Sequence, residues 1–458
     1  MPDKSGIKFG FTSAKGRTVE AAFDGGAVST DGGLLLVREV DRKLGLIRGL
    51  ARRLSDQRQS GKVRHDTETM LRQRVMALVA GWEDLNDAET LRHDPVHQIA
   101  AGDDQALASA PTLCRFENGQ SRAAAWAVNE ALVEQFIASH RKAPPVLVLD
   151  FDATDTPVHG KQEGRFFHGY YDCHCFLPLY VFCGDQLLVA YLRRSNIDAA
   201  KHAAAILKLL VSRLRRSWPR TKIVLRADSG FCRDLLLNWC DRHDVKYVVG
   251  IARNERLVAE VAALMQVAQQ RFEQTKLKQR LFCAFDYAAG SWRRIRWVIA
   301  KAEHSEKGSN PRFIVTNIVG DPQKLYDHRY CQRGEMENRV KEQLMLFADR
   351  VSAHRWWANQ WRLCLSAIAY TLLEALRRLA LQGTELAQAT CATLRSNSSN
   401  LGPWSLKNSP WCACTSAHTT PCRISSGGSS QPSSRIDLTG AAPGACDQWG
   451  LGAVSVRI

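Results

Sequence analysis

Three carboxylates that lie far apart in the sequence have settings that suit phosphodiester chemistry. Residues 146–152, Val-Leu-Val-Leu-Asp-Phe-Asp, are typical of a strand buried on both faces that ends in acidic side chains. A second such strand, residues 222–227, leads directly to Asp228 and a Ser-Gly turn. The third carboxylate, Glu337, lies in a segment with helical periodicity. Hard divalent cations prefer carboxylate oxygens that rigid elements hold in place, so these residues predict a metal site.

The helical segment also carries positive charge beside its carboxylate. Arg333, Glu337 and Lys341 recur every four residues and therefore share one face of a helix. Two strand-end aspartates and this glutamate could hold two Mg²⁺ ions, or Mn²⁺ in their place. Such a pair activates an attacking water or hydroxyl and stabilises the leaving oxygen. The planar fork of Arg333 and the point charge of Lys341 would then bind phosphate oxygens.

The first strand leaves open which aspartate is the ligand. Asp150, Asp152 and Asp155 lie within a few residues of one another. Acidic residues at the end of a strand also cap turns and solvate loops, so a purely structural role fits each of them. Asp150 is the main alternative to Asp152, and Asp155 fits better as a loop residue.

The composition indicates a globular protein that binds a polyanion. Of 458 residues, 45% are hydrophobic and 24% are charged, and the formal net charge is +16. This basic excess favours double-stranded DNA as the partner. In the N-terminal region, contact with the DNA backbone and an ordinary solvated helical surface both fit the pattern. The basic residues that cluster there are Arg42, Lys43, Arg48, Arg52, Arg53, Arg58, Lys62 and Arg64.

Cysteine usage and hydropathy predict a cytoplasmic, nucleoid-associated protein without membrane contact. The 14 cysteines are scattered mostly singly, which is typical of reduced thiols. Cys173-His174-Cys175 lacks a second pair at zinc spacing. The most apolar helical stretch, residues 363–381, is interrupted by Glu374, Arg377 and Arg378, so no membrane span is expected.

The order of elements predicts an α/β fold with a ribonuclease-H-like mixed sheet flanked by helices. Strands are expected from residue 146, at 176–183 and 186–192 around a Gly184-Asp185 turn, and at 222–227 and 246–251. Helices are expected to begin at Asp198 and at Leu235. Three strands followed by helix, strand, helix and strand suit such a sheet.

Changes of pattern divide the chain into five regions. Residues 1–118 are expected to form a mostly helical, DNA-binding domain, and residues 119–256 the first part of the core. Residues 257–317 read as a β-rich insertion, because short alternating strands follow a polar helix. Residues 318–394 complete the core with helices, and residues 395–458 form an atypical tail.

With these motifs in place, the chain resembles the DDE transposases of bacterial insertion sequences, in the group marked by a Tyr-x2-Arg-x3-Glu signature (DDE transposase domain, group one). The matching motifs are Asp152-Ala-Thr154, Asp228-Ser-Gly-Phe231, and Tyr330 with Arg333 and Glu337. Residues 164–171, Gly-Arg-Phe-Phe-His-Gly-Tyr-Tyr, match one branch of the group. The resemblance extends from about residue 10 to residue 394.

The resemblance implies roles for these residues. Asp152, Asp228 and Glu337 would be catalytic and would bind the metal ions, and Tyr330 would orient its helix or contact DNA. Where the group usually has a lysine seven residues after the glutamate, this chain has Leu344, and Lys341 is expected to take its place. The resemblance also implies a β-insertion, recognition of terminal inverted repeats and a homodimeric synapse.

Four further residues have two interpretations each. Arg253 and Asn254 follow a core strand, where contact with a DNA end and a plain turn are equally compatible with the pattern. Trp292 and Trp297 in the predicted insertion could stack on a flipped base. Packing between short strands is the favoured interpretation of both tryptophans.

The C-terminal region departs from the pattern of the rest. After Leu394 the chain has Ser, Gly and Pro clusters and almost no periodicity, which fits a disordered extension. Our preferred hypothesis is a shifted reading frame, because back-translation of residues 396–418 one base earlier permits an apolar basic segment followed by an alternating strand. Coding DNA that excludes those codons would contradict it.

Together these features predict a DNA transposase that cleaves element ends and joins the freed 3′-OH to target DNA. One alternative is a ribonuclease-H-like nuclease that cuts without joining. Another is a catalytically inactive or C-terminally damaged relative that only occupies element ends.

Overall fold

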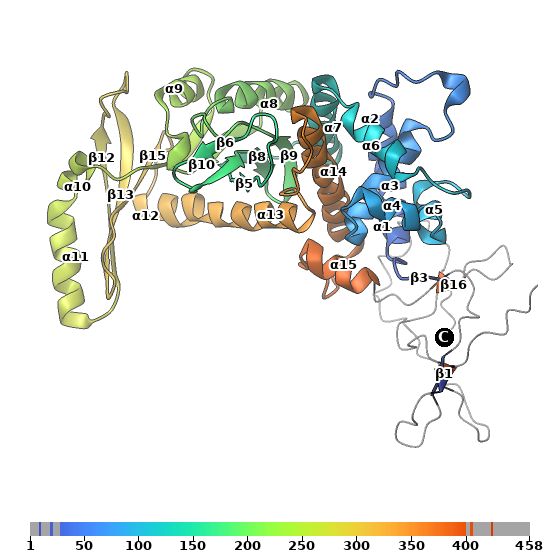
Figure 1. Ribbon diagram of the computed structural model, residues 1–458. Helices are drawn as coiled ribbons and strands as arrows, with labels where there is room; N and C mark the ends of the chain where they lie inside the picture. The colour runs from blue at the N-terminus through green and yellow to red at the C-terminus, as the bar shows by residue number, and fades with distance from the viewer. Residues whose placement is uncertain (1–8, 11–18, 22–27, 400–403, 406–422, 425–458) are drawn as a thin grey trace, which may run out of the picture.

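The computed structural model describes residues 9–10, 19–21, 28–399, 404–405 and 423–424. The part from residue 28 to residue 399 is elongated, with a long hairpin and helix at one end, a central sheet, and the N-terminal helices at the other end (Figure 1). The predicted tail falls mostly outside the described residues. Five short strands complete the described part: β1 (Phe9–Gly10), β2 (Val19–Ala21), β3 (Val28–Ser29), β16 (Trp404–Ser405) and β17 (Arg423–Ile424).

Between residues 34 and 138 the structure is helical. Asp66 caps the third of these helices, because its carboxylate accepts a hydrogen bond of 2.7 Å from the Thr69 amide. Gly81 ends the same helix with a φ of +103°, a conformation that favours glycine. The helices are α1 (Leu34–Leu44), α2 (Leu46–Ala51), α3 (Thr67–Ala80), α4 (Ala88–Leu91), α5 (Pro95–Ala101), α6 (Ala110–Asn118) and α7 (Arg122–Ala138).

One mixed sheet forms the centre of the molecule. Along its main path the strand order is β12-β13-β15-β11-β10-β4-β8-β9, and β10 is parallel to both β4 and β11 while the other neighbours are antiparallel. The prediction of a mixed α/β architecture is therefore confirmed. The strands are β4 (Val146–Ala153), β8 (Leu179–Cys183), β9 (Gln186–Tyr191), β10 (Lys222–Ala227), β11 (Lys246–Ile251), β12 (Gln279–Tyr287), β13 (Arg296–Ser305), β14 (Gly308–Ser309, paired with β13) and β15 (Arg312–Thr316).

Alternating side chains along the strands build a core on each face of the sheet. Leu149 and Phe151 of β4 pack on one face with helices α8 (Ala203–Ser217) and α9 (Asp234–Arg242). On the other face, Tyr180 and Phe182 join a core that also contains the long helix α14 (Trp356–Ala380) and the N-terminal helices. The N-terminal helices thus share their apolar core with the sheet.

The three strands of the predicted insertion continue the central sheet. β15 pairs with β11, β13 with β15, and β12 with β13, all antiparallel. Helices α10 (Glu255–Glu260) and α11 (Ala262–Thr275) precede them, and α11 lies beside the β12–β13 hairpin (Figure 1). This continuation depends on pairing between distant segments, which local patterns do not reveal.

Helix α8 begins later than the sequence predicts. Asp198 was expected to start it, yet the first helical residue is Ala203. The Asp198 carboxylate accepts a hydrogen bond from the Ala200 amide and pairs with Arg233 at 2.6 Å, which holds a turn instead. His202 then has a φ of +72°, in the left-handed region, so the helix starts after it.

The segment that carries the Tyr-x2-Arg-x3-Glu residues is helical with a changing pitch. It begins with α12 (Pro322–Leu325) and widens to a π-turn over Tyr326–Tyr330. It then tightens to a 3-10 turn over Cys331–Arg333 before α13 (Gly334–Met345). π-turns inside helices occur often at functional sites.

The last helix described, α15 (Cys391–Ser399), crosses the expected boundary at residue 394. It is anchored by Glu342 of α13, whose carboxylate accepts hydrogen bonds from the Cys391 amide at 3.1 Å and from Arg377 at 2.7 Å. In the part of the chain that the structure describes, no helix combines the length and apolarity that a bilayer span needs.

Candidate active site

Alternate positions along the parallel pair β4–β10, called rungs below, place the acidic residues. Arg226 of β10 stands opposite Asp150 of β4, and Ala227 stands opposite Phe151. Asp152 is the next residue of β4, and Asp228 directly follows the last residue of β10. Because side chains alternate between faces, Asp150 and Asp152 share the face opposite to Phe151.

The first rung is an ion pair closed to solvent. Arg226 donates to both carboxylate oxygens of Asp150, at 2.5 and 2.7 Å, and both residues are buried. The Arg226 Nη1 also donates to the Arg329 carbonyl at 2.8 Å, in the π-turn before α13. Burial nevertheless raises the pKa of Asp150, although Arg226 lowers it. Asp150 is therefore fully engaged by its arginine, which leaves Asp152 as the available aspartate of β4.

The second rung brings two carboxylates together without such a partner. Burial raises the pKa of Asp152 to about 6, and the negative charges of Asp228 and Glu337 add to that rise while Arg333 opposes it. The Asp228 carboxylate accepts a hydrogen bond of 2.9 Å from the Gly230 amide, which fixes it at the start of a short 3-10 turn. Because this site disfavours the ionised form of its carboxylates, a bound cation would stabilise their negative charge.

Arg333 joins the third carboxylate to the first. Its guanidinium lies 3.4 Å from Asp152 and 2.7 Å from Glu337, so one arginine bridges β4 and α13. The Glu337 side chain is 50% exposed, whereas that of Asp152 is 16% exposed. Glu337 thus stands at the open side of the cluster and Asp152 at its buried side.

Tyr330 packs beneath this arrangement. A β-carbon on Gly250 of β11 would lie 2.6 Å from the Tyr330 hydroxyl, so only glycine leaves room for the ring. Burial raises the pKa of Tyr330, and the nearby Arg333 lowers it. Tyr330 is therefore a support of the Arg333 helix against the sheet.

The remaining predicted site residues lie apart from the carboxylates or have other partners. Lys341 and Arg253 are exposed, and neither forms an ion pair with a residue that the structure describes. Asn254 caps α10 by accepting a hydrogen bond of 3.0 Å from the Leu257 amide, and it donates to the Tyr287 hydroxyl. Their contacts with DNA stay predictions. Leu344, at the position where the group usually has lysine, packs against the apolar core.

Sequence reasoning did not single out Arg226 or Tyr171. Arg226 precedes Asp228 by two residues, as Asp150 precedes Asp152, and this matched spacing was an available signal. Burial raises the pKa of Tyr171 to about 12, and the negative charges of Asp155, Asp152 and Asp228 add to this rise. Tyr171 belongs to the turn of a small hairpin formed by β6 (Phe166–His168) and β7 (Cys173–Phe176), and β7 also pairs with β5 (Thr156–Pro157).

The tryptophans of the β-rich segment are packed. Trp297 lies partly buried in the small core beneath α12. Trp292 packs edge-on against Tyr287 with 5.7 Å between ring centroids, and Arg296 lies 5.7 Å above its ring. These contacts agree with the favoured prediction of packing.

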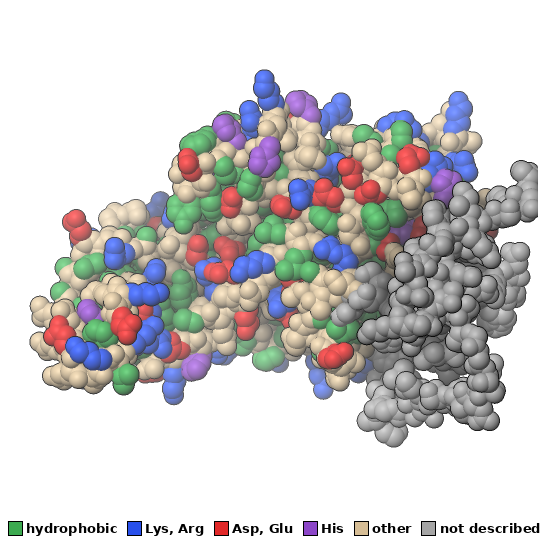
Figure 2. All heavy atoms as spheres, turned by 60° about the horizontal axis from the view of Figure 1, so that its bottom comes forward, with side chains coloured by type: hydrophobic (Ala, Val, Ile, Leu, Met, Phe, Trp, Pro, Cys, Tyr) green, Lys and Arg blue, Asp and Glu red, His purple; other side chains and the backbone are tan. Residues whose placement is uncertain are grey.

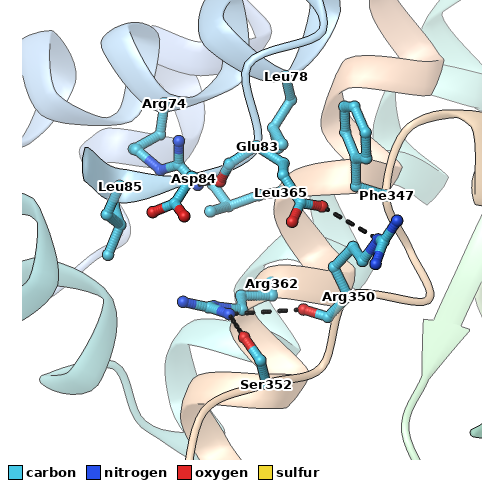
Figure 3. Close-up of a pocket in the computed structure, with 10 residues that line it drawn as sticks. All are labelled: Arg74, Leu78, Glu83, Asp84, Leu85, Phe347, Arg350, Ser352, Arg362 and Leu365. Carbon is cyan, nitrogen blue, oxygen red and sulfur yellow. Dashed lines mark hydrogen bonds and ion pairs between the residues drawn. The ribbon is translucent and has the colours of Figure 1, made fainter. Parts of the chain in front are cut away.

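A cavity elsewhere in the molecule is lined by paired charges (Figure 3). It lies between α3, the following loop and α14, where Arg350 pairs with Glu83 at 3.3 Å. Arg74 and Arg362 both bind Glu117 beside it, at 2.6 and 3.3 Å. The arginines of this cavity already have carboxylate partners. The cavity therefore fits a structural role, in which ion pairs connect neighbouring helices.

The donor chemistry of the cluster suits a hard divalent cation, since Asp152, Asp228 and Glu337 offer only carboxylate oxygens. Among the residues that the structure describes, no three His, Cys, Asp or Glu side chains are grouped so that they could hold a metal ion. Arg333 supplies the positive charge between Asp152 and Glu337 instead. The Glu337 side chain, which pairs with Arg333, is half-exposed.

Comparison with solved structures gives one further observation. The chain is similar to the piggyBac transposase in a cryo-EM structure of its synaptic complex with hairpin DNA. The sequence identity is 10%, the match covers 80% of this chain and 79% of that chain, and the TM-score is 0.42. No curated protein sequence matches the chain.

The family comparison is decisive for the chain as a whole. The model of the family described as transposase DDE domain group 1 matches residues 11–399, which include both strand-end aspartates, Arg333 and Glu337. The match also includes the N-terminal helices and α15, so it covers most of the sequence. The chain therefore belongs to the DDE-domain transposases of group 1.

Proposed function

We propose that the protein is a DNA transposase that cleaves the ends of an insertion sequence and joins them to target DNA, with divalent metal ions bound by Asp152, Asp228 and Glu337. The observation that carries this proposal is the convergence around Arg333. One guanidinium contacts a strand-end aspartate and a helical glutamate that are 185 positions apart, and a second aspartate, Asp228, directly follows the neighbouring parallel strand.

Each side chain has a defined part in this proposal. Mg²⁺, or Mn²⁺ in its place, would supply the activation of a water or 3′-OH and the stabilisation of the leaving oxygen. Asp152 holds its oxygens on a strand and Asp228 on the turn that directly follows one, and Glu337 approaches from the solvent side. Arg333 is free to bind a phosphate oxygen once its carboxylate partners have turned to the metal.

The DNA path extends from the cluster along basic side chains. Lys341 lies two turns after Arg333 on one helical segment, and exposed Arg253 follows β11. Figure 2 shows Lys and Arg side chains spread along the length of one face, interspersed with acidic ones. We infer that Arg333 and Lys341 bind phosphates nearest the reaction, and that Arg253 and Asn254 contact DNA farther out.

The fold supports the same proposal. The order β9-β8-β4-β10-β11, three antiparallel strands followed by two parallel ones, is the order of a ribonuclease-H-like core. We propose the division into regions at residues 118, 256, 317 and 394, with β12, β13 and β15 as the insertion. A homodimeric synapse on terminal inverted repeats and a cytoplasmic, nucleoid-associated location complete the proposal.

The test is cleavage and joining by the purified protein. Labelled duplexes from the DNA that flanks the gene are incubated with Mg²⁺ and the wild type, Glu337→Gln, or Glu335→Gln. Glu335 is an exposed acid on the same helix and serves as the matched control. We expect cutting and strand transfer by the wild type and the control, and neither by Glu337→Gln.

The other outcomes separate the alternatives. Cutting without joined product would indicate a nuclease, and specific binding without cutting would indicate an inactive relative. In the second case, the frame after Leu394 would be restored and the assay repeated. Activity that survives Glu337→Gln would overturn the proposed carboxylate set.

A further inference from the structure

Arg193 is a buried cation that lies shortly after the end of β9. Only 1% of the residue is exposed, and it pairs with no acid in the described part of the chain. Burial lowers the pKa of Arg193 to about 10, because desolvation disfavours its charged form. A buried charge without an acidic partner lowers stability unless its donors are satisfied, so its hydrogen bonds indicate what it does.

Three backbone carbonyls take the place of an acidic partner for Arg193. Its Nε donates to the Leu177 carbonyl at 2.9 Å. Its Nη1 donates to the carbonyls of Ala199 and Lys201, both at 2.8 Å. These carbonyls belong to two separate segments of the chain. Because the planar guanidinium carries its donors in a fixed fork, it sets the distance between the two segments.

The first segment borders the strand that carries Asp152. β8 pairs antiparallel with the end of β4. Just before β8, the Pro178 carbonyl accepts a hydrogen bond of 3.3 Å from the Thr154 amide. Leu177, which Arg193 holds, is therefore tied to the end of β4.

The second segment, the loop of residues 195–202, packs on the turn that begins with Asp228. A β-carbon on Gly230 would lie 3.4 Å from the β-carbon of Ala199, so the loop lies directly against this turn. The Gly230 amide donates to the Asp228 carboxylate at 2.9 Å. The loop thus supports the residue that orients Asp228.

A second contact joins the same loop to the start of α9. Asp198 of the loop pairs at 2.6 Å with Arg233, which directly precedes α9. The Asp198 carboxylate also accepts a hydrogen bond of 2.9 Å from the Ala200 amide. Both side chains of the ion pair are about half exposed, so the pair contributes little by itself. The buried Arg193 is the firmer support of the loop.

We infer that Arg193 is a positioning residue of the active site, which fixes the distance between Asp152 and Asp228 by joining the segments beside them. The inference rests on the proposed function for the role of these two carboxylates. Arg193 acts through the backbone carbonyls that it holds. Because a functional constellation works only within roughly 0.5 Å of its productive geometry, such a support affects the rate of reaction more than the binding of DNA.

Amide hydrogen exchange measures this support without DNA or metal. Wild type, Arg193→Met and the control Arg74→Met are compared by mass spectrometry of peptides that cover residues 195–202 and 228–233. Arg74 is also buried, but it binds Glu117 among the N-terminal helices. We expect exchange in both stretches to be at least about tenfold faster in Arg193→Met, because the lost hydrogen bonds come from a charged donor. In Arg74→Met these two stretches should exchange as in the wild type.

Cleavage kinetics then separate positioning from binding. At equal folded fraction, checked by melting temperature, Arg193→Met should lower kcat about tenfold to a hundredfold and leave KM for the DNA within about twofold. Arg193→Lys keeps the charge, but its single amine cannot reach both segments, so it should show the same loss.

A second variant acts at the contact between the loop and the turn. Ala199→Gly removes only the methyl group that lies against Gly230. We expect faster exchange at residues 228–233 and a smaller fall in kcat than in Arg193→Met. If Arg193→Met does not fold, the exchange and kcat of Ala199→Gly decide the question.

Three outcomes would overturn the inference. Exchange at residues 228–233 could stay at the wild-type rate in Arg193→Met and in Ala199→Gly. It could rise equally throughout the protein, which would make Arg193 a general support of the fold. The variants could also keep the wild-type kcat despite faster exchange. Because exchange is measured without DNA, a wild type that does not cleave would refute the proposed function, while the exchange rates would still decide whether Arg193 holds the Asp228 turn.

Discussion

Two alternate rungs of the strand pair β4–β10 use the same residue types for different purposes. On the rung of Asp150 and Arg226, acid faces base and the pair is buried. Two residues farther along, Asp152 and Asp228 place two acids at the carboxyl ends of these strands, with Arg333 shared between Asp152 and Glu337. The charges of the first rung balance, whereas the second rung has more negative than positive charge.

The difference lies in compensation rather than in burial alone. Burial disfavours the ionised form of both aspartates of β4. Asp150 receives two hydrogen bonds from one guanidinium, whereas Asp152 receives a single long contact from Arg333. A paired buried charge is stable, and an incompletely paired one favours whatever cation can approach. Function is therefore expected on the second rung and stability on the first.

The largest expected effect comes from neutralising the second rung. Asp152→Asn or Asp228→Asn should lower Mg²⁺-dependent cleavage by at least about a thousandfold, because each removes an anionic metal ligand. Folding should survive, since Asp152→Asn removes a partly desolvated charge. Cleavage rates and melting temperatures measured on the same preparations test both statements, and a loss of folding in Asp152→Asn would contradict the comparison.

Breaking the first rung should affect stability instead. Asp150→Asn or Arg226→Met leaves a buried charge without its partner and should lower the free energy of unfolding by about 3–5 kcal/mol. Urea denaturation followed by tryptophan fluorescence measures this change. The double variant Asp150→Leu/Arg226→Leu is the control, because removing both charges should restore part of the loss.

Single variants of Asp150 and Arg226 that unfold at the wild-type urea concentration would show that this rung is dispensable for stability.

A second consequence concerns the helical segment that carries the Tyr-x2-Arg-x3-Glu residues. Arg226 also holds the Arg329 carbonyl at 2.8 Å, so Arg226→Met should reduce cleavage more than Asp150→Asn does at equal folded fraction.

A smaller effect is expected where the two rungs meet the helix. Arg333→Lys keeps the charge but cannot reach Asp152 and Glu337 together, so cleavage should fall about tenfold to a hundredfold. Stability should change by less than about 1 kcal/mol, because the Glu337 side is exposed. Steady-state cleavage assays at several DNA concentrations would detect it, and a rate equal to the wild type would exclude a role for the guanidinium fork.

The elements that carry the site could be predicted because their signals are local. Buried aliphatic runs before Asp152 and Asp228 identify strands, and the four-residue spacing from Arg333 to Glu337 identifies a helical face. The pairing of Arg226 with Asp150 could not be predicted with the same ease, because register between distant strands depends on tertiary packing. The later start of α8 has a similar cause, since Asp198 is diverted by Arg233.

The continuation of the sheet by β15, β13 and β12 is non-local as well. The alternating pattern reveals the strands, but it does not reveal that β15 would pair with the edge of β11. The hairpin of residues 165–176 likewise depends on contacts with distant elements, because β7 pairs with β5 and Phe176 packs on Trp356 of α14. Chemistry-bearing residues were therefore easier to identify than the supports that hold them.

The smallest expected effect tests, far from the active site, whether positive partners offset the burial of an acid. Glu303 on β13 is buried, and burial alone would raise its pKa, but hydrogen bonds from Lys301, Lys278 and Asn310 lower it to about 2. An acid whose pKa is lowered on folding stabilises the protein above its unfolded pKa, near 4.5, and loses that contribution as the pH falls toward 2.

Glu303→Gln should therefore cost about 1–2 kcal/mol at pH 7, a value reduced for the exposure of Lys278. The difference from the wild type should shrink between pH 4.5 and pH 2. Urea denaturation at several pH values measures it, with Glu306→Gln as the control because Glu306 is exposed and forms no ion pair with a described residue. If the Glu303→Gln difference stayed constant with pH, compensation by lysine would not be the source of its stability. The comparison of the two rungs would then depend on hydrogen-bond geometry rather than on charge.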